Sequence, residues 1–184
     1  MTGKLGMTRA LHLLGKGEDP GPALREASEA FQRCLEAAPW DVSLRVLRAR
    51  VDIIGLRWVA KQKKLTAESF QAATAPLLPL LDRERTDPQL YQTLAEVRAI
   101  EAAWLLDRGK GVEEVVNAGL EMTTKALALN PRMAKAFATQ GALLLARARA
   151  ASDPAVRSRA AQSAEAALSA AMRHDPLLEP LLRK

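Results

Sequence analysis

The chain has 184 residues, of which 48% are hydrophobic and 4% aromatic, and its net charge of +6 corresponds to a pI of about 9.8. This length allows one single-core domain or a short array of repeats and excludes two large domains. The single cysteine, Cys34, excludes an intrachain disulfide, and a reducing, cytoplasmic setting is therefore expected. The longest uncharged runs have 11 residues, well short of the roughly 20 that a membrane-spanning helix needs, so no membrane contact is expected.

The composition favours an all-α protein. Strong helix formers such as Ala, Leu, Arg and Glu dominate, whereas β-branched residues and Tyr are too sparse for several strands. A first, shorter helix is expected to end at the Gly-Lys-Gly triplet 15–17. A long amphipathic helix follows over 41–62, with Asp41 as its N-cap and with apolar residues three and four positions apart, namely Leu44, Leu47, Val51, Ile54 and Trp58.

The middle of the chain is less regular. Pro76 and Pro79 predict a kink or break between residues 75 and 79, because proline cannot continue a helix without losing a hydrogen bond. A second long helix is expected over 87–108, and the Gly-Lys-Gly triplet 109–111 ends it.

Four prolines divide the chain at regular intervals. Pro39, Pro88, Pro131 and Pro176 are separated by 49, 43 and 45 residues, a spacing that indicates helical repeats. The last three follow Asp or Asn, and the Asp-Pro pair 153–154 repeats the arrangement. Because proline disfavours the helical conformation in the residue before it, one helix ends there, and the Asx side chain can cap the next.

The residues twelve, eight and five positions before three of these prolines are small, larger and small. They lie on one helical face and would allow a neighbouring helix to approach closely. The three sets are Ala27, Phe31 and Cys34; Gly119, Thr123 and Ala126; and Ala164, Leu168 and Ala171.

This pattern resembles the second helix of the tetratricopeptide repeat, a helix-turn-helix unit that stacks into a right-handed solenoid, and Phe137, Gly141 and Leu144 extend the match into the helix before it. The resemblance implies an all-α, right-handed α-solenoid of about four such repeats in a single domain, 1–184. The repeats are expected at 5–39, 40–88, 89–131 and 132–176, with a C-terminal cap at 177–184. The spacing exceeds the family's usual length of about 34 residues, so long first (A) helices are expected.

No catalytic or metal-binding motif is present in the sequence. The two histidines, His12 and His174, are far apart in the chain, and one cysteine cannot form a thiol motif. We therefore expect a protein that is not an enzyme and that has no cofactor and no metal site. Cys34 is expected to pack as a buried apolar residue. Trp58 and Trp104 are expected in the core and Trp40 partly exposed.

Four basic residues on the helix 41–62 and just after it are the candidate binding residues. Arg50, Arg57, Lys61 and Lys64 are spaced by seven, four and three positions and share one flank, whereas Arg48 on the other flank can pair with Asp52. The alternative interpretation is a solvated charged face. The resemblance implies that A helices line a concave groove, so the expected function is a scaffold or adaptor module that binds a peptide or partner helix, acidic in character, through these four residues.

Two other functions remain open. The pI and the basic flank also suit nucleic acid, although no aromatic residues alternate with the basic ones for base stacking. The last fifty residues resemble the terminal repeats of helical regions attached to some bacterial serine/threonine kinases, which implies a regulatory appendage of a kinase system; the chain itself has no kinase motif. The sequence leaves the oligomeric state open.

Overall fold

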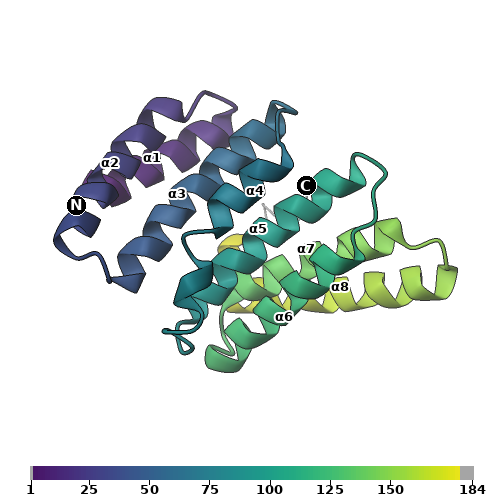
Figure 1. Ribbon diagram of the computed structural model, residues 1–184. Helices are drawn as coiled ribbons and strands as arrows, with labels where there is room; N and C mark the ends of the chain where they lie inside the picture. The colour runs from purple at the N-terminus through teal and green to yellow at the C-terminus, as the bar shows by residue number, and fades with distance from the viewer. Residues whose placement is uncertain (1, 179–184) are drawn as a thin grey trace. The chain divides into compact units, whose positions relative to one another are not determined.

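The computed structural model describes residues 2–178, and within this range every element is helical and no strand is present, which confirms the all-α prediction. By its contacts the chain divides into two compact units, the N-terminal unit Met1–Arg85 and the C-terminal unit Thr86–Lys184. The elements in chain order (Figure 1) are α1 (Thr2–Lys16), α2 (Gly21–Ala37), α3 (Val42–Lys61), α4 (Ala67–Thr74), the 3-10 helix η1 (Leu78–Leu80), α5 (Pro88–Leu106), α6 (Glu113–Leu129), α7 (Ala134–Ala150), α8 (Pro154–His174) and the 3-10 helix η2 (Pro176–Leu178).

The N-terminal unit is a layered set of four helices. Helix α2 packs against α1 and α3, and α3 also contacts α1 and α4. Two apolar clusters hold α1, α2 and α3 together, one centred on Ala10 and Ile54 and the other on Phe31 and Val51. Helix α3 therefore has buried residues on more than one side, because it has neighbours on more than one side.

The described part of the C-terminal unit, residues 86–178, contains two helical hairpins, followed by η2. Helix α5 packs against α6, and α7 packs against α8, while α7 also contacts both α5 and α6. A cluster that includes Ala102, Val116 and Leu143 fills the space between α5, α6 and α7. Within this core the buried Gln92 side chain donates a hydrogen bond of 2.9 Å from Nε2 to Thr139 Oγ1, which ties α5 to α7.

Three helices begin with the aspartate cap that the sequence predicts. Asp41 accepts a hydrogen bond from the Leu44 N–H of α3 at 2.9 Å. Asp87 and Asp153 accept from the backbone N–H groups two residues ahead, at 2.7 Å in α5 and 2.8 Å in α8, with proline at the first helical position. These carboxylates satisfy N–H groups that have no partner inside the helix.

Asn130 does not cap the following helix, and that prediction is wrong. Its Oδ1 accepts from the Arg132 N–H at 3.2 Å in a local turn, and α7 begins only at Ala134. An Asx turn of this kind uses the same side-chain oxygen as a cap but bends the chain before the helix begins.

The predicted break in the middle of the N-terminal unit is confirmed. Helix α4 ends at Thr74 after eight residues, and turns and η1 follow through Pro76 and Pro79.

The Glu68 carboxyl group in the first turn of α4 has a lowered pKa, because its carboxylate accepts a hydrogen bond from its own backbone N–H and another from the Thr66 side chain.

The two Gly-Lys-Gly triplets end helices as expected. Gly17 follows α1 with a φ of 77°, and Gly109 follows α5 with a φ of 63°, a left-handed conformation that glycine adopts without steric cost. Of the predicted C-terminal cap at 177–184, residues 179–184 lie outside the described residues. None of the helices described is both long and apolar enough to cross a bilayer.

Cys34 is exposed, so its prediction as a packed core residue is wrong. Phe31, three residues earlier on the same face of α2, lies with its ring against Gly3 of α1, whereas no helix among the described residues covers the Cys34 side chain. Trp58 and Trp104 are half-buried, Trp58 at the edge of an apolar cluster, so their prediction as core residues is not met in full. Trp40 is 70% exposed, in agreement with its prediction.

Candidate binding groove on the N-terminal unit

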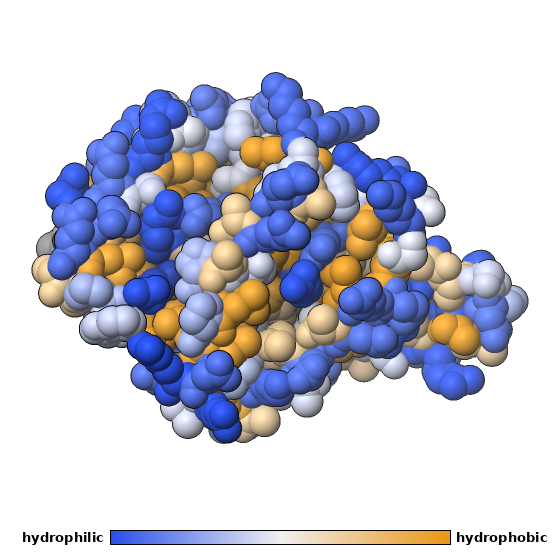
Figure 2. Space-filling model, in the orientation of Figure 1, coloured by the Kyte–Doolittle hydropathy of each residue, from blue (hydrophilic) through white to orange (hydrophobic). Residues whose placement is uncertain are grey.

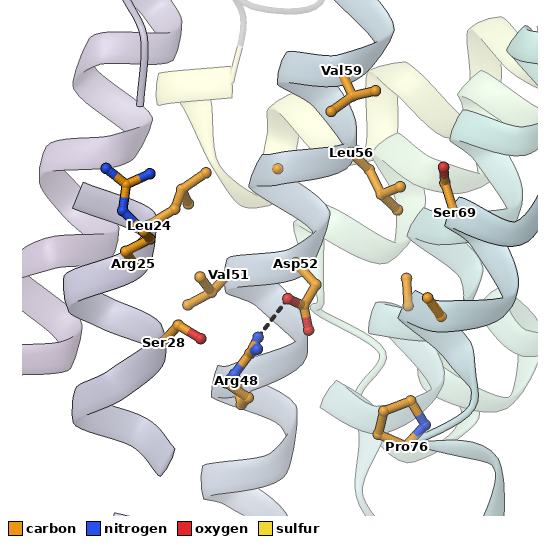
Figure 3. A pocket seen from close by; sticks show the side chains of 13 residues that line it. Leu24, Arg25, Ser28, Arg48, Val51, Asp52, Leu56, Val59, Ser69 and Pro76 are labelled. Atoms are coloured by element: carbon orange, nitrogen blue, oxygen red, sulfur yellow. Dashed lines mark hydrogen bonds and ion pairs between the residues drawn. The ribbon is translucent and has the colours of Figure 1, made fainter. Parts of the chain in front are cut away.

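A cavity of about 590 Å³ lies over α3 between α2 and α4. Its apolar lining comes from all three helices: Leu24 from α2 with Leu56 and Val59 from α3 (Figure 3), and Ala72 from α4. The short length of α4 and the turn at Pro76 leave this side of α3 only partly covered, which is why the cavity exists.

A second cavity of about 380 Å³ continues the first along α3. It is lined by Leu35, Pro39 and Arg45, among others, and it shares Arg48, Asp52 and Pro76 with the first cavity. Together the two cavities form one groove along α3 from Arg45 to Val59, which we call the α3 groove. At 1.5 Å per residue these fourteen steps correspond to about 21 Å.

Charged groups lie in the middle of the α3 groove. Arg48 and Asp52 form an ion pair of 2.5 Å, as predicted, and both side chains are partly exposed (Figure 3). A pair this exposed contributes at most about 1 kcal/mol to stability. Arg25 lines the groove from α2 and has no ion pair in the part of the chain that the structure describes. The groove therefore combines apolar surface with an excess of positive charge.

The predicted binding residues lie elsewhere. Arg50, Arg57 and Lys61 are on the side of α3 that faces away from the groove, since at about 100° per residue they are roughly 180° from Asp52 and Val59. None of them lines either cavity of the α3 groove. Their contact with a partner stays a prediction.

Two of the four predicted residues, Lys61 and Lys64, also do not lie on the helical flank as expected. Lys61 donates a hydrogen bond of 2.7 Å from Nζ to the Leu14 carbonyl near the C-terminal end of α1, where a cation is favoured by the helix dipole. Lys64 lies beyond the end of α3, after Lys63, whose φ is 56°. The four basic side chains therefore do not form one continuous helical flank.

One signal for the groove is present in the sequence. Arg48, Asp52, Gly55 and Val59 are spaced by four, three and four positions, which places them on one helical face. Two charged residues and a glycine conceal that face when apolar residues alone are counted, and the predicted apolar stripe through Val51 and Ile54 marks the side that packs on α1 and α2.

The remaining polar side chains suggest structural roles. Within residues 2–178 no group of three His, Cys, Asp or Glu side chains is placed to hold a metal ion. His174 stacks on Phe137 with ring centroids 5.5 Å apart. Arg147 joins α7 to α6 through Glu113 at 3.2 Å and through Asn117. On the face shown in Figure 2, the surface over α1 to α3 is mainly hydrophilic, with small hydrophobic patches between the polar groups.

Comparison of the chain with protein-family models, with curated proteins and with solved structures returns no match.

Proposed function

We propose that the protein is a non-enzymatic interaction module whose α3 groove binds a peptide or a short helix of a partner protein. The groove itself is the observation that supports this function: three helices supply its apolar walls, and it extends for about 21 Å along α3. A helical segment of about 14 residues, or an extended one of about six, has this length. Burial of apolar side chains there would supply roughly 25 cal/mol per Å².

We further propose that the helix pairs stack in the manner of tetratricopeptide repeats, in the right-handed sense that the resemblance implies. The contacts in the C-terminal unit support this: the α5–α6 hairpin meets the next hairpin through both of its helices, each in contact with α7. A hairpin that cannot bury its apolar face alone gains a core by stacking and leaves surface available to a partner.

A library of random peptides of about 15 residues, displayed on phage and selected against the full chain, tests the groove. Ala72 is exposed on α4 and lines the groove, so Ala72→Trp fills it without changing the core. Ala67→Trp is the matched control, because Ala67 is exposed on the same helix but outside both cavities. Selected peptides are expected to bind wild type and Ala67→Trp alike and to bind Ala72→Trp at least about tenfold more weakly.

Failure to enrich any peptide, or equal binding of the selected peptides to Ala72→Trp, would show that the groove is not a binding site.

Nucleic-acid binding is the second candidate, because α3 carries five basic residues and one acidic residue. Random single-stranded and double-stranded oligonucleotides provide that test. Binding that falls steeply between about 50 and 200 mM salt would favour the second candidate.

A further inference from the structure

Trp40 presents a large apolar surface to solvent. It lies in the short connection between α2 and α3, and 70% of it is exposed. Tryptophan is among the residues that most often dominate the energy of protein interfaces, because its ring buries a large area at a small entropic cost. The position of Trp40 is therefore a candidate contact for a partner.

Two guanidinium groups lie over the Trp40 ring. Arg45, in the first turn of α3, has its Cζ 5.8 Å from the ring centroid, and Arg83, in the segment after η1, has its Cζ at 4.8 Å. Arg45 Nε also donates to the Pro39 carbonyl at 2.8 Å. Three separate segments of the N-terminal unit thus meet at one indole. The ring restrains both guanidinium groups, and the Pro39 carbonyl restrains Arg45 further.

Within the described residues, the acidic side chains near Arg45 and Arg83 do not form ion pairs with them, so both guanidinium groups can bind a carboxylate of a partner. Asp41 accepts the N-cap hydrogen bond from Leu44, and Asp82 and Glu84 flank Arg83 in the sequence without forming an ion pair with it. In the part of the chain that is described, neither Arg45 nor Arg83 has a carboxylate partner. A guanidinium stacked on an aromatic ring keeps its N–H groups at the ring edge, where a carboxylate can accept two of them.

The cluster adjoins the α3 groove. Pro39 and Arg45 line the second cavity, and Trp40 follows Pro39 in the chain, so this end of the groove lies beside the cluster. The opposite end, at Leu56, Val59 and Ala72, is mainly apolar, and Ser69 adds one hydroxyl group to it. The groove is therefore asymmetric, with hydrophobic walls at one end and restrained positive charge beside an exposed ring at the other.

We propose that Trp40, Arg45 and Arg83 form the recognition site for an aspartate or glutamate side chain of the peptide bound in the α3 groove. The inference rests on the proposed function and specifies the partner: a segment with apolar residues at one end and a carboxylate at the other. The two arginines bind the carboxylate, the Trp40 ring packs against the adjoining peptide residue, and the asymmetry fixes the direction in which the peptide lies.

Three peptide libraries test this chemistry. They share their random positions and differ in a short block at either end, composed of Asp and Glu, of Asn and Gln, or of Lys. The full chain is used as wild type, Trp40→Ala, Arg83→Gln and the control Arg33→Gln, since Arg33 is exposed on α2 outside both cavities. Circular dichroism establishes that the variants keep their helices.

Wild type and Arg33→Gln are expected to retain the acidic library about tenfold more than the neutral one, and the lysine library least. Trp40→Ala and Arg83→Gln are expected to lose most of that preference while still retaining the neutral library. Equal retention of the acidic and neutral libraries by wild type would overturn the inference, as would an unchanged preference in both variants.

The outcomes separate the inference from the proposed function. If Ala72→Trp lowers retention of the neutral library and Trp40→Ala changes nothing, the groove binds peptides but the acidic recognition site is wrong. If wild type retains no library, both fail. Oligonucleotide binding that Trp40→Ala abolishes would assign the cluster to nucleic acid and would likewise overturn the inference.

Discussion

At the scale of single residues, Trp40 gives a direct optical test of the charge around it. Trp58 and Trp104 are half-buried, so collisional quenchers act mainly on Trp40. Iodide is expected to quench the protein's fluorescence more strongly than caesium, because Arg45 and Arg83 attract anions to the exposed ring. The difference should become smaller in Trp40→Phe, where only the half-buried Trp58 and Trp104 remain, and it should also shrink as salt is added. Equal quenching by the two ions in wild type would mean that the guanidinium groups do not lie over the ring in solution.

The aspartate caps give a second prediction at this scale. Replacing Asp41 or Asp87 by Ala removes the oxygen that accepts a hydrogen bond from the first turn of the helix, and each change is expected to lower the free energy of unfolding by about 1 kcal/mol. Asn130→Ala removes only a turn contact and should cost less than either. Urea denaturation followed by circular dichroism measures all three. A larger loss for Asn130→Ala than for Asp41→Ala would contradict the assignment of the caps.

At the scale of helices, two glycines with different surroundings should respond oppositely to the same change. A Cβ at Gly141 would lie 2.6 Å from Leu168 Cδ2, so Gly141→Ala should displace the Leu168 side chain from the α7–α8 contact and destabilise the protein by about 1 kcal/mol. A Cβ at Gly55 would meet only Leu24 at 3.8 Å, so Gly55→Ala should stabilise α3 by about 0.5–1 kcal/mol. Thermal denaturation of the two variants beside wild type gives the signs. Stabilisation by Gly141→Ala would refute the close contact.

Helix α4 should open more readily than the helices of the C-terminal unit. It has eight residues, and helices of that length are marginal without strong tertiary support. The 21-residue α8, by contrast, lies against α7 along its buried face. Hydrogen exchange followed by mass spectrometry near neutral pH should therefore show faster exchange for peptides from 67–80 than for peptides from 160–171. Equal protection of the two segments would argue against a weakly held wall of the groove.

The sequence allowed the helices to be predicted much better than the binding surface. Local chemistry decides where a helix begins and ends, so Asp41, the break at Pro76 and the turn at Gly109 could be predicted from their neighbours alone. The exposure of Cys34 could not be predicted in this way, because it depends on how the neighbouring helices cover α2 and not on the pattern within α2. The α3 groove depends on how little of α3 the short α4 covers, and Arg48 and Asp52 make that face appear to be simple solvated surface.

At the scale of the whole molecule, the two units should each fold when expressed separately as 1–85 and 86–184. The apolar clusters described here draw their residues from one unit at a time. Both fragments are expected to show helical circular dichroism spectra and a cooperative thermal transition. A fragment that is unfolded alone, yet becomes helical when the other is added, would show that the units depend on each other for their stability.

The composition of the inner face of α8 affects how its position along the neighbouring helix is defined. All of its buried residues are alanines, at 160, 164, 167, 170 and 171. An alanine has no rotamers to lose, so ordering this face costs no side-chain entropy. A row of identical methyl groups, however, does little to define the axial register of one helix along another, since a shift by one turn presents nearly the same surface. The Leu168 side chain, which lies over the bare backbone of Gly141, is the irregular feature that distinguishes one register from the next.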